Sequence, residues 1–211
     1  GTQSHDYNML EVFRIFEDDE RFNFRIITSV CKEEMQTEDY HYDVLYIPEE
    51  YPKDWKEYYN EILPPKNKEQ YFMIVGHGMI DFAAHSSIVI ESEKPIKNAP
   101  VFPSKLLMES APISIFGHVH VSQKNKNIHY CGSFSRMAYG EENDKGWLLI
   151  YYDTKNDKYS VKRVINDLAP EYNTIKLSTV YSTEDSVDKF ISKVEKLTEK
   201  SNLRIKIDLT E

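Results

Sequence analysis

The chain has 211 residues, enough for one domain of typical size, about 150 residues, together with a small appendage. Its composition of 40% hydrophobic, 29% charged and 13% aromatic residues is that of a globular protein, and it excludes disordered, collagen-like and disulfide-stapled chains. The net charge of −9 argues against a protein that holds nucleic acid through a basic surface alone.

The sequence also carries no sign of secretion or membrane insertion. No apolar run is long enough to cross a bilayer, and the first residues lack the pattern of a signal peptide. Cys31 and Cys131 are too few for a disulfide framework and too far apart for a paired metal knuckle. We therefore expect reduced cysteines, no membrane contact and a cytoplasmic location. Frequent Lys, Asn, Tyr and Ile residues favour a bacterial or phage-infected host cell.

The N-terminal part of the chain predicts two helices and two strands. Apolar residues recur at helical spacing over residues 6–17, which indicates a helix. Near alternation of apolar residues predicts a strand over residues 21–30, and a second strand is predicted over residues 43–47. Residues 52–63 predict a short amphipathic helix that ends where two prolines follow.

Two continuous apolar runs further along the chain end in glycine and histidine. Residues 71–75 lead into Gly76-His77-Gly78, and residues 112–116 lead into Gly117-His118-Val119-His120. Continuous runs of this length are typical of buried strands. Because ligand sites in α/β proteins lie where such strands end, the pattern predicts an α/β sandwich with its site at these two strand ends.

The rest of the chain predicts two hairpins followed by a small lobe. The first hairpin has a polar turn at residues 124–127, and the second has strands at residues 147–152 and 159–165. Beyond residue 170 the pattern changes, and it predicts a strand, a helix and a strand at residues 174–177, 183–199 and 203–209. This βαβ-like tail is expected to form a separate lobe.

Three histidines at the two strand ends form the strongest chemical signal. His77 lies between two glycines. His118 and His120 are two positions apart, and Gly117 precedes them. Within a regular strand such a pair would point the same way, whereas in a turn the two rings can diverge toward neighbouring ions. A histidine taken singly is more often a core or surface residue, but three imidazoles from two strand ends supply much of a transition-metal site.

A further histidine begins the chain. His5 is followed by Asp6, and a carboxylate beside an imidazole can orient the ring and bias its protonation. The alternative is that Asp6 merely begins the predicted helix. His85 has no partner at a recognisable spacing, and His41 and His129 are expected to be structural or exposed.

These motifs together resemble a known family. The matching residues are Gly76-His77, Gly117-His118-Val119-His120, Tyr130-Cys131-Gly132-Ser133 with Arg136, Glu141 or Glu142, and Lys145-Gly146. They resemble the second half of a calcineurin-like metallophosphoesterase. The Tyr-x-Gly-Ser-x-x-Arg stretch and the Lys-Gly pair are similar to its SbcD-like branch, the nuclease subunits of DNA double-strand-break repair complexes.

The resemblance spans most of the chain and implies a fold and a domain division. The expected fold is α/β, a metallophosphoesterase-type β-sandwich flanked by helices, without the family's N-terminal strands. The tail resembles the start of the family's small α+β capping domain. Residues 1–167 are accordingly expected to form the nuclease domain and residues 168–211 the capping domain or its first part.

The resemblance also implies a centre with two divalent ions, manganese being the usual metal and magnesium, iron or zinc the alternatives. His77 and His118 would bind one ion and His120 the other. Ser4 stands where the family has a metal-binding asparagine, and a hydroxyl is a poor substitute for an amide oxygen. Further implied roles are His5 as the catalytic acid with Asp6 as its orienting carboxylate, and structural or phosphate-facing support from Ser133 and Arg136.

Two other metal-binding motifs of the family, D-x-H and G-D, do not occur upstream of Ser4-His5-Asp6, where the family has them. The chain is therefore expected to be a fragment, or to need a second polypeptide that supplies the missing half, and to be inactive without those ligands. Three imidazoles neutralise no charge, so they hold two cations poorly without a bridging carboxylate.

The implied activity is metal-assisted hydrolysis of phosphodiesters in DNA, as an exonuclease, an endonuclease or both. Bound cations could then attract phosphate despite the acidic net charge. The implied partners are an SbcC-like ATPase and a second copy of the chain. Two alternatives stay open: a related phosphoesterase that acts on nucleotides or small phosphoesters, and a catalytically inactive scaffold that needs a second chain.

Overall fold

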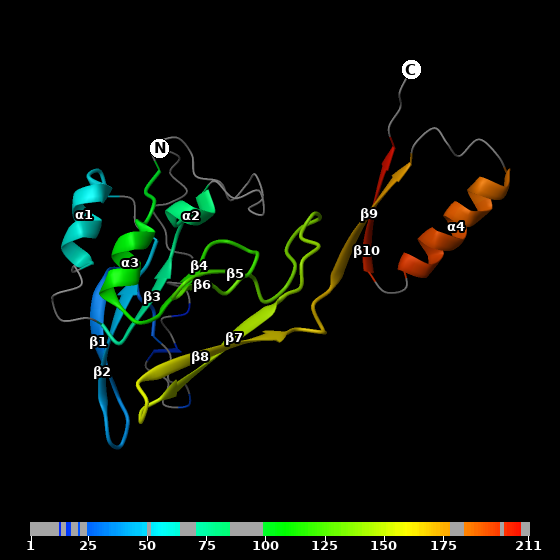
Figure 1. The fold of residues 1–211 in the computed structure, drawn as a ribbon. Coiled ribbons are helices and arrows are strands. Elements are labelled where there is room, and N and C mark those ends of the chain that lie inside the picture. Colours follow the sequence, from blue (N-terminus) through cyan, green and yellow to red (C-terminus); the bar gives the residue numbers. More distant parts are fainter. Residues whose placement is uncertain are drawn as a thin grey trace. The chain divides into compact units, whose positions relative to one another are not determined.

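The computed structural model describes most of the chain, with gaps. The described residues are 13, 16–17, 21, 25–49, 52–63, 71–84, 99–177, 184–198 and 201–207. They divide between two compact units, of which the first is Gly1–His118 with Lys124–His129 and the second is Val119–Gln123 with Tyr130–Glu211. The fold is mixed α/β, as predicted, and contains a multi-stranded sheet with helices beside it (Figure 1).

The largest sheet has six strands in the order β1-β2-β3-β4-β6-β5. The strands are β1 (Cys31–Gln36), β2 (His41–Ile47), β3 (Met73–His77), β4 (Ser114–Gly117), β5 (Gln123–Asn125) and β6 (Ile128–Tyr130). β1 pairs antiparallel with β2, whereas β2, β3 and β4 are mutually parallel. The carboxyl ends of these three parallel strands therefore meet at one edge of the sheet, which is where the predicted site residues follow.

All three parallel strands carry buried side chains, which the apolar runs predict for β3 and β4. In β2, the neighbouring residues Val44 and Leu45 point to opposite faces and are both almost fully buried. Ile74 in β3 and Phe116 in β4 are fully buried as well. Strands covered on both faces need apolar side chains at successive positions, which explains why the sequence shows continuous runs there and no alternation.

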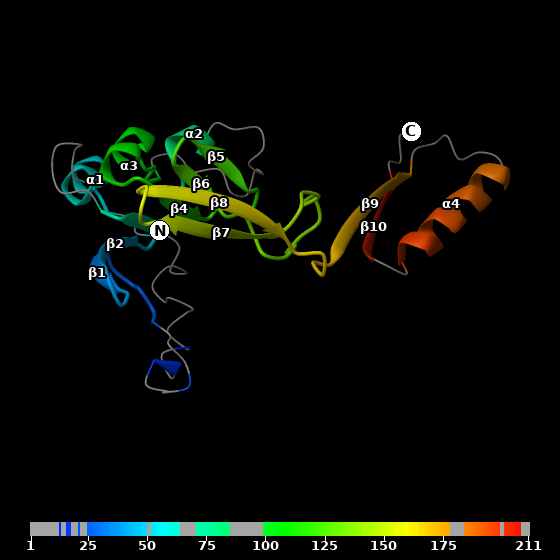
Figure 2. The same cartoon turned by 60° about the horizontal axis from the view of Figure 1, so that its bottom comes forward.

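Helices of the same unit pack beside this sheet (Figures 1 and 2). They are α1 (Trp55–Ile62), α2 (Asp81–Ala84) and α3 (Ser104–Ser110). α1 was predicted from its amphipathic pattern, and it ends before Pro64, which cannot continue a helix. A chain of aromatic rings joins it to the sheet, because Tyr59 lies 4.2 Å from Phe102 and Phe102 lies 5.1 Å from Phe116, measured between ring centroids.

The first strand of the sheet lies later in the chain than the sequence predicts. Residues 25–30 have irregular backbone, so the strand predicted over residues 21–30 is wrong there, and β1 begins at Cys31. Pairing with β2 across a tight turn sets this position, with the amide of Thr37 donating to the carbonyl of Tyr40 at 2.9 Å. The β1 sequence is mostly polar, which explains why apolar alternation missed it.

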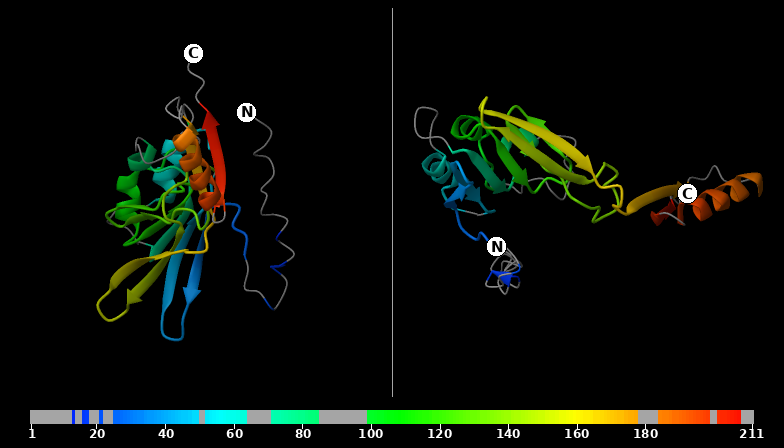
Figure 3. Two further views of the ribbon diagram at one scale, coloured as in Figure 1. Left: turned by 90° about the vertical axis from the view of Figure 1, so that its right-hand side faces the viewer. Right: turned by 90° about the horizontal axis from the view of Figure 1, so that it is seen from below.

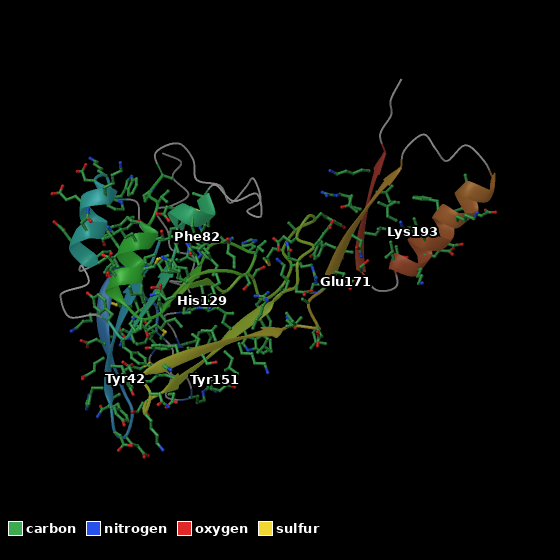
Figure 4. All side chains as sticks on the ribbon, in the orientation of Figure 1. Tyr42, Phe82, His129, Tyr151, Glu171 and Lys193 are labelled. Carbon is green, nitrogen blue, oxygen red and sulfur yellow. The ribbon has the colours of Figure 1, made fainter. Side chains whose placement is uncertain are left out.

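Two predicted hairpins are present. β5 and β6 form the first, but its turn is shorter than predicted, because Lys124 and Asn125 belong to β5 and only Lys126 and Asn127 form the turn. In the second unit, β7 (Gly146–Asp153) pairs antiparallel with β8 (Lys158–Ile165). The Asp153 carboxylate accepts hydrogen bonds from the amides of Lys155 and Asn156 and from the Asn156 side chain. Tyr151 lies on the exposed face of this hairpin (Figure 4).

The C-terminal segment forms the predicted β-α-β arrangement (Figure 3). β9 (Glu171–Leu177) and β10 (Ser201–Ile207) pair in parallel along their whole length, and α4 (Glu184–Thr198) connects them in sequence. The strands predicted to start at residues 174 and 203 start too late. The first residues of β9 and β10 are mostly polar, so they do not show the apolar pattern used for prediction. The ring of Tyr139 contacts this segment, with Tyr172 at 5.1 Å and the Arg204 guanidinium at 4.6 Å.

Two sequence predictions can be compared with the structure only within the described residues. The helix predicted over residues 6–17 lies outside the described residues except for Phe13, Phe16 and Glu17. Among the residues that the structure describes, no helix has the length and apolar character needed to span a bilayer. The boundary between residues 1–167 and 168–211 stays a prediction.

Candidate metal centre

The edge where the parallel strands end brings together one carboxylate and two imidazoles. Glu49 follows the last residue of β2 by two positions, His77 is the last residue of β3, and His118 comes directly after β4. The parallel register places Ile47 beside Gly76 and His77 beside Gly117, so the three side chains leave neighbouring strands at about the same level.

The three side chains meet through their polar atoms. The Nδ1 atom of His77 lies 2.9 Å from Oε2 of Glu49, and the Nδ1 atom of His118 lies 3.4 Å from Oε1 of the same carboxylate. One ligand atom from each of the three residues lies within 4.8 Å of the others. The two rings meet edge to face with centroids 5.4 Å apart. All three side chains reach solvent, so the cluster is accessible to a ligand.

The donor set fits a divalent cation. Neutral imidazoles and a carboxylate are the ligands with which proteins bind zinc, manganese and ferrous iron. The carboxylate also supplies negative charge that imidazoles alone lack. Because each oxygen of Glu49 faces a different histidine, this residue can either bind an ion directly or hold the Nδ1–H of a ring whose other nitrogen binds.

Two glycines on adjacent strands make room for the site. A Cβ atom at Gly117 would lie 2.7 Å from Cδ2 of His77, and a Cβ atom at Gly76 would lie 2.6 Å from the Phe116 ring. Each strand thus places a glycine beside the large ring of its neighbour. Gly76 admits a core side chain, whereas Gly117 admits the imidazole of the candidate ligand.

His118 adopts a backbone conformation that residues with side chains rarely take. Its φ is +96°, outside the regions preferred by L-amino acids. Such strain costs about 1–3 kcal/mol and persists only where the surrounding structure imposes it, most often at functional sites. The turn that carries this strain directs His118 toward Glu49.

His120 takes part in a different cluster, within the second unit. Its Nδ1 atom lies 2.9 Å from Oε1 of Glu141, and Oε2 of Glu141 lies 2.7 Å from Nζ of Lys145. The side chains of Glu141 and Lys145 are almost entirely buried, while that of His120 is 38% exposed. His118 and His120, two residues apart, therefore contact two different carboxylates.

The charge state of Glu141 follows from its partners. Burial alone would raise the pKa of its carboxyl, but hydrogen bonds from Lys145 and His120, the charge of Lys145 and the Met137 amide outweigh burial and hold the pKa below its ordinary value. Glu141 is therefore ionised at neutral pH.

The structure places Ser133 and Arg136 in the same unit as His120. The amide of Ser133 donates to the carbonyl of His120 at 3.0 Å. The Arg136 guanidinium donates to the carbonyl oxygens of Glu141, Ala169 and Pro170 at 3.0–3.3 Å. Through these contacts, Nε and Nη1 of Arg136 support the backbone around the cluster.

Sequence reasoning missed one member of the site, Glu49. A usable signal was present, since Glu49 follows a strand that the sequence predicts, and polar residues at strand ends were the basis for selecting His77 and His118. Ser4, His5 and Asp6 lie outside the described residues, so their roles stay predictions.

Part of the chain is similar to a known viral protein. No protein-family model matches the chain. The chain is 40% identical over 70 residues to a protein of Invertebrate iridescent virus 6 named "Putative phosphoesterase 244L". The similar segment covers 31% of this chain and 24% of the viral protein, so the chain spans about a quarter of the length of the relative it matches.

Proposed function

We propose that this chain is a metal-dependent phosphoesterase. The observation that carries the proposal is the cluster of Glu49, His77 and His118 at the ends of three parallel strands, whose ligand atoms lie within 4.8 Å of one another. The similarity to a viral protein named a phosphoesterase supports the same class of reaction. Histidine and carboxylate ligands at one sheet edge suit hydrolysis assisted by a divalent ion.

In this proposal each residue of the site has its own role. Glu49, His77 and His118 hold one divalent ion, and His120 serves a second. Bound there, the ions supply Lewis-acid chemistry that activates water for attack on phosphorus. The carboxylate of Glu49 offsets cationic charge, and the absence of a side chain at Gly117 leaves room for the His77 imidazole.

The finer proposal concerns the family and its substrate. The motifs around His77, His118 and His120 and the Lys145-Gly146 pair resemble SbcD-like metallophosphoesterases. We therefore infer DNA as the substrate, manganese as the metal, and an SbcC-like ATPase as the partner. His5 would protonate the leaving oxygen with Asp6 orienting it, and the domains would divide between residues 1–167 and 168–211.

Metal binding and hydrolysis test the proposal in two steps. Calorimetric titration of the full chain with Mn²⁺ should give saturable binding, and Glu49→Gln and His118→Ala should each weaken it by at least about tenfold. Glu57→Gln is a matched control, because Glu57 lies on α1 and takes no part in the cluster. Equal affinity in all four proteins would reject the site.

Hydrolysis is then assayed with Mn²⁺ on linear duplex DNA, bis-p-nitrophenyl phosphate and p-nitrophenyl phosphate. Cleavage of DNA that Glu49→Gln abolishes supports the nuclease, and cleavage of the small esters alone supports a phosphoesterase of small substrates. Metal binding without hydrolysis of any substrate would contradict catalysis by this chain alone and favour an inactive fragment or scaffold that needs a second chain.

A further inference from the structure

The buried pair of Glu141 and Lys145 contacts His120, whose side chain is 38% exposed. Lys145 is 0% exposed in its side chain and Glu141 is 3% exposed. A buried ion pair of this kind contributes little net stability compared with apolar residues of similar size. Its presence beside a histidine at a strand end therefore calls for a role other than packing.

Each oxygen of the Glu141 carboxylate has a defined partner. Oε2 accepts from Nζ of Lys145 at 2.7 Å and from the amide of Met137 at 3.4 Å. Oε1 faces Nδ1 of His120 at 2.9 Å. An ionised carboxylate can only accept hydrogen bonds, so the short contact with His120 requires that Nδ1 carry a hydrogen. In a neutral imidazole the lone pair then resides on Nε2.

We propose that Glu141 is a positioning residue that holds His120 in the tautomer protonated on Nδ1, so that Nε2 presents its lone pair to a divalent cation. The cation in this statement rests on the function proposed above, whereas the tautomer rests on the contacts of Glu141 alone. Hydrogen bonds that ligand histidines donate to carboxylates fix both the tautomer and the ring orientation and strengthen the ring as a ligand.

The surrounding contacts hold Glu141 in place from several sides. Nε of Arg136 donates to the main-chain carbonyl of Glu141 at 3.0 Å. Nζ of Lys145 also lies 3.4 Å from the carbonyl of His120, so one ammonium group contacts both the carboxylate and the backbone of the histidine that it orients. The ring of His120 is therefore fixed at its Nδ1 edge and at its own main chain.

A glutamine at position 141 would reverse the tautomer. Lys145 and the Met137 amide are donors, so the single oxygen of the Gln amide must face them. The amide nitrogen then faces His120 as a donor, and Nδ1 must accept. The proton moves to Nε2, which can no longer bind a cation. Glu141→Gln preserves the shape of the side chain, and its effect therefore reports the hydrogen bond.

Nitrogen-15 NMR of histidine-labelled, metal-free chain tests the tautomer directly. Spectra are recorded at about pH 8, where an ordinary imidazole is neutral, and His120→Gln identifies the resonances of His120. We expect the Nδ1–H form in the unmodified chain and the Nε2–H form in Glu141→Gln. Glu142→Gln is the matched control, because it removes the same charge at the adjacent exposed position.

The spectrum of the unmodified chain decides the assignment even if a variant does not fold, since an Nε2–H form there overturns it. An unchanged tautomer in folded Glu141→Gln overturns it as well. Titration with Mn²⁺ supplies the second readout, in which Glu141→Gln should lower the affinity of the ion bound by His120 by about 10- to 100-fold.

The two proposals fail in different ways. A reversed tautomer with unchanged Mn²⁺ affinity would contradict the proposal that Glu141 prepares His120 to bind a cation. No Mn²⁺ binding by any form of the chain, with the expected tautomers present, would contradict the metal-dependent function and leave the positioning of His120 by Glu141 supported.

Discussion

Gly117 lies opposite His77 in the parallel pairing of β4 with β3, and a Cβ atom at Gly117 would come within 2.7 Å of the imidazole. One register position earlier, Gly76 lies opposite Phe116 and would contact that ring at 2.6 Å. At two successive positions of the pairing, a glycine on one strand therefore lies opposite a large ring on the other. One glycine serves the hydrophobic core, and the other serves the candidate metal centre.

We expect Gly117→Ala to weaken metal binding more than it weakens the fold. The new methyl group must displace the His77 ring, whose side chain is half exposed and can move outward at little cost in packing. Displacement separates Nδ1 of His77 from Glu49. Calorimetry should show Mn²⁺ affinity reduced by about tenfold or more, while urea denaturation should show a loss below about 1 kcal/mol.

Gly76→Ala is the matched comparison. Its methyl group would meet the ring of Phe116, which is fully buried. Overpacking of this kind costs about 1–3 kcal/mol. A smaller loss of stability in Gly76→Ala than in Gly117→Ala would contradict the assignment of the two glycines to core and site.

Lys145→Met should be one of the most destabilising substitutions in the second unit. It removes the ammonium group from a buried pair and leaves the Glu141 carboxylate without its charged partner. Breaking a buried pair in this way costs about 3–5 kcal/mol. The pair of Lys32 and Asp43 on β1 and β2 is about half exposed, so Lys32→Met should cost less than about 1 kcal/mol. Urea denaturation of both variants measures the difference, and equal losses would contradict it.

The fold and part of the site follow from the sequence, because the buried strands leave a distinctive pattern. Continuous apolar runs predicted β3 and β4, and the glycine-histidine ends placed His77 and His118 at one sheet edge. Polar strands leave no such pattern, which explains the misplaced strand at residues 21–30. The short helix α3 likewise has too few residues to show a period.

The position of Glu49 after a predicted strand made it a candidate, but its contact with His77 depends on register. It lies beside His77 only because β2 and β3 pair in parallel with Ile47 next to Gly76. The role inferred for Glu141 depends in the same way on a contact 21 positions away in sequence. Pattern analysis recognises histidines near glycines, but it does not predict which distant carboxylate will face them.

We expect Arg136→Ala to lower the free energy of unfolding and to leave substrate binding less affected. The guanidinium donates to three carbonyl oxygens, those of Glu141, Ala169 and Pro170. Hydrogen bonds from charged groups contribute about 1.5–3 kcal/mol each, so we expect a loss of at least about 1.5 kcal/mol in urea denaturation. Arg25→Ala is the control, since the Arg25 side chain is 67% exposed. A variant with unchanged stability and a raised KM for phosphodiesters would instead indicate contact between Arg136 and the substrate.

His129 should make the stability of the chain depend on pH in mildly acidic solution. It lies on β6 (Figure 4) and is 8% exposed. Burial, and secondarily the charge of Lys124, lower its pKa. Below the unfolded pKa of about 6.5, the unfolded chain binds a proton that the folded chain still rejects. The free energy of unfolding should therefore fall as pH decreases from about 6.5 toward the folded pKa, and level off below it.

Urea denaturation at a series of pH values measures this dependence. A single group can contribute a slope of at most about 1.4 kcal/mol per pH unit, and His129→Gln should remove that slope. His41→Gln is the control, because His41 is exposed and paired with Glu34 at the surface. If His129→Gln retained the slope of the unmodified chain while His41→Gln lost it, the titrating group would be the surface histidine, and burial of His129 would not control stability in this range.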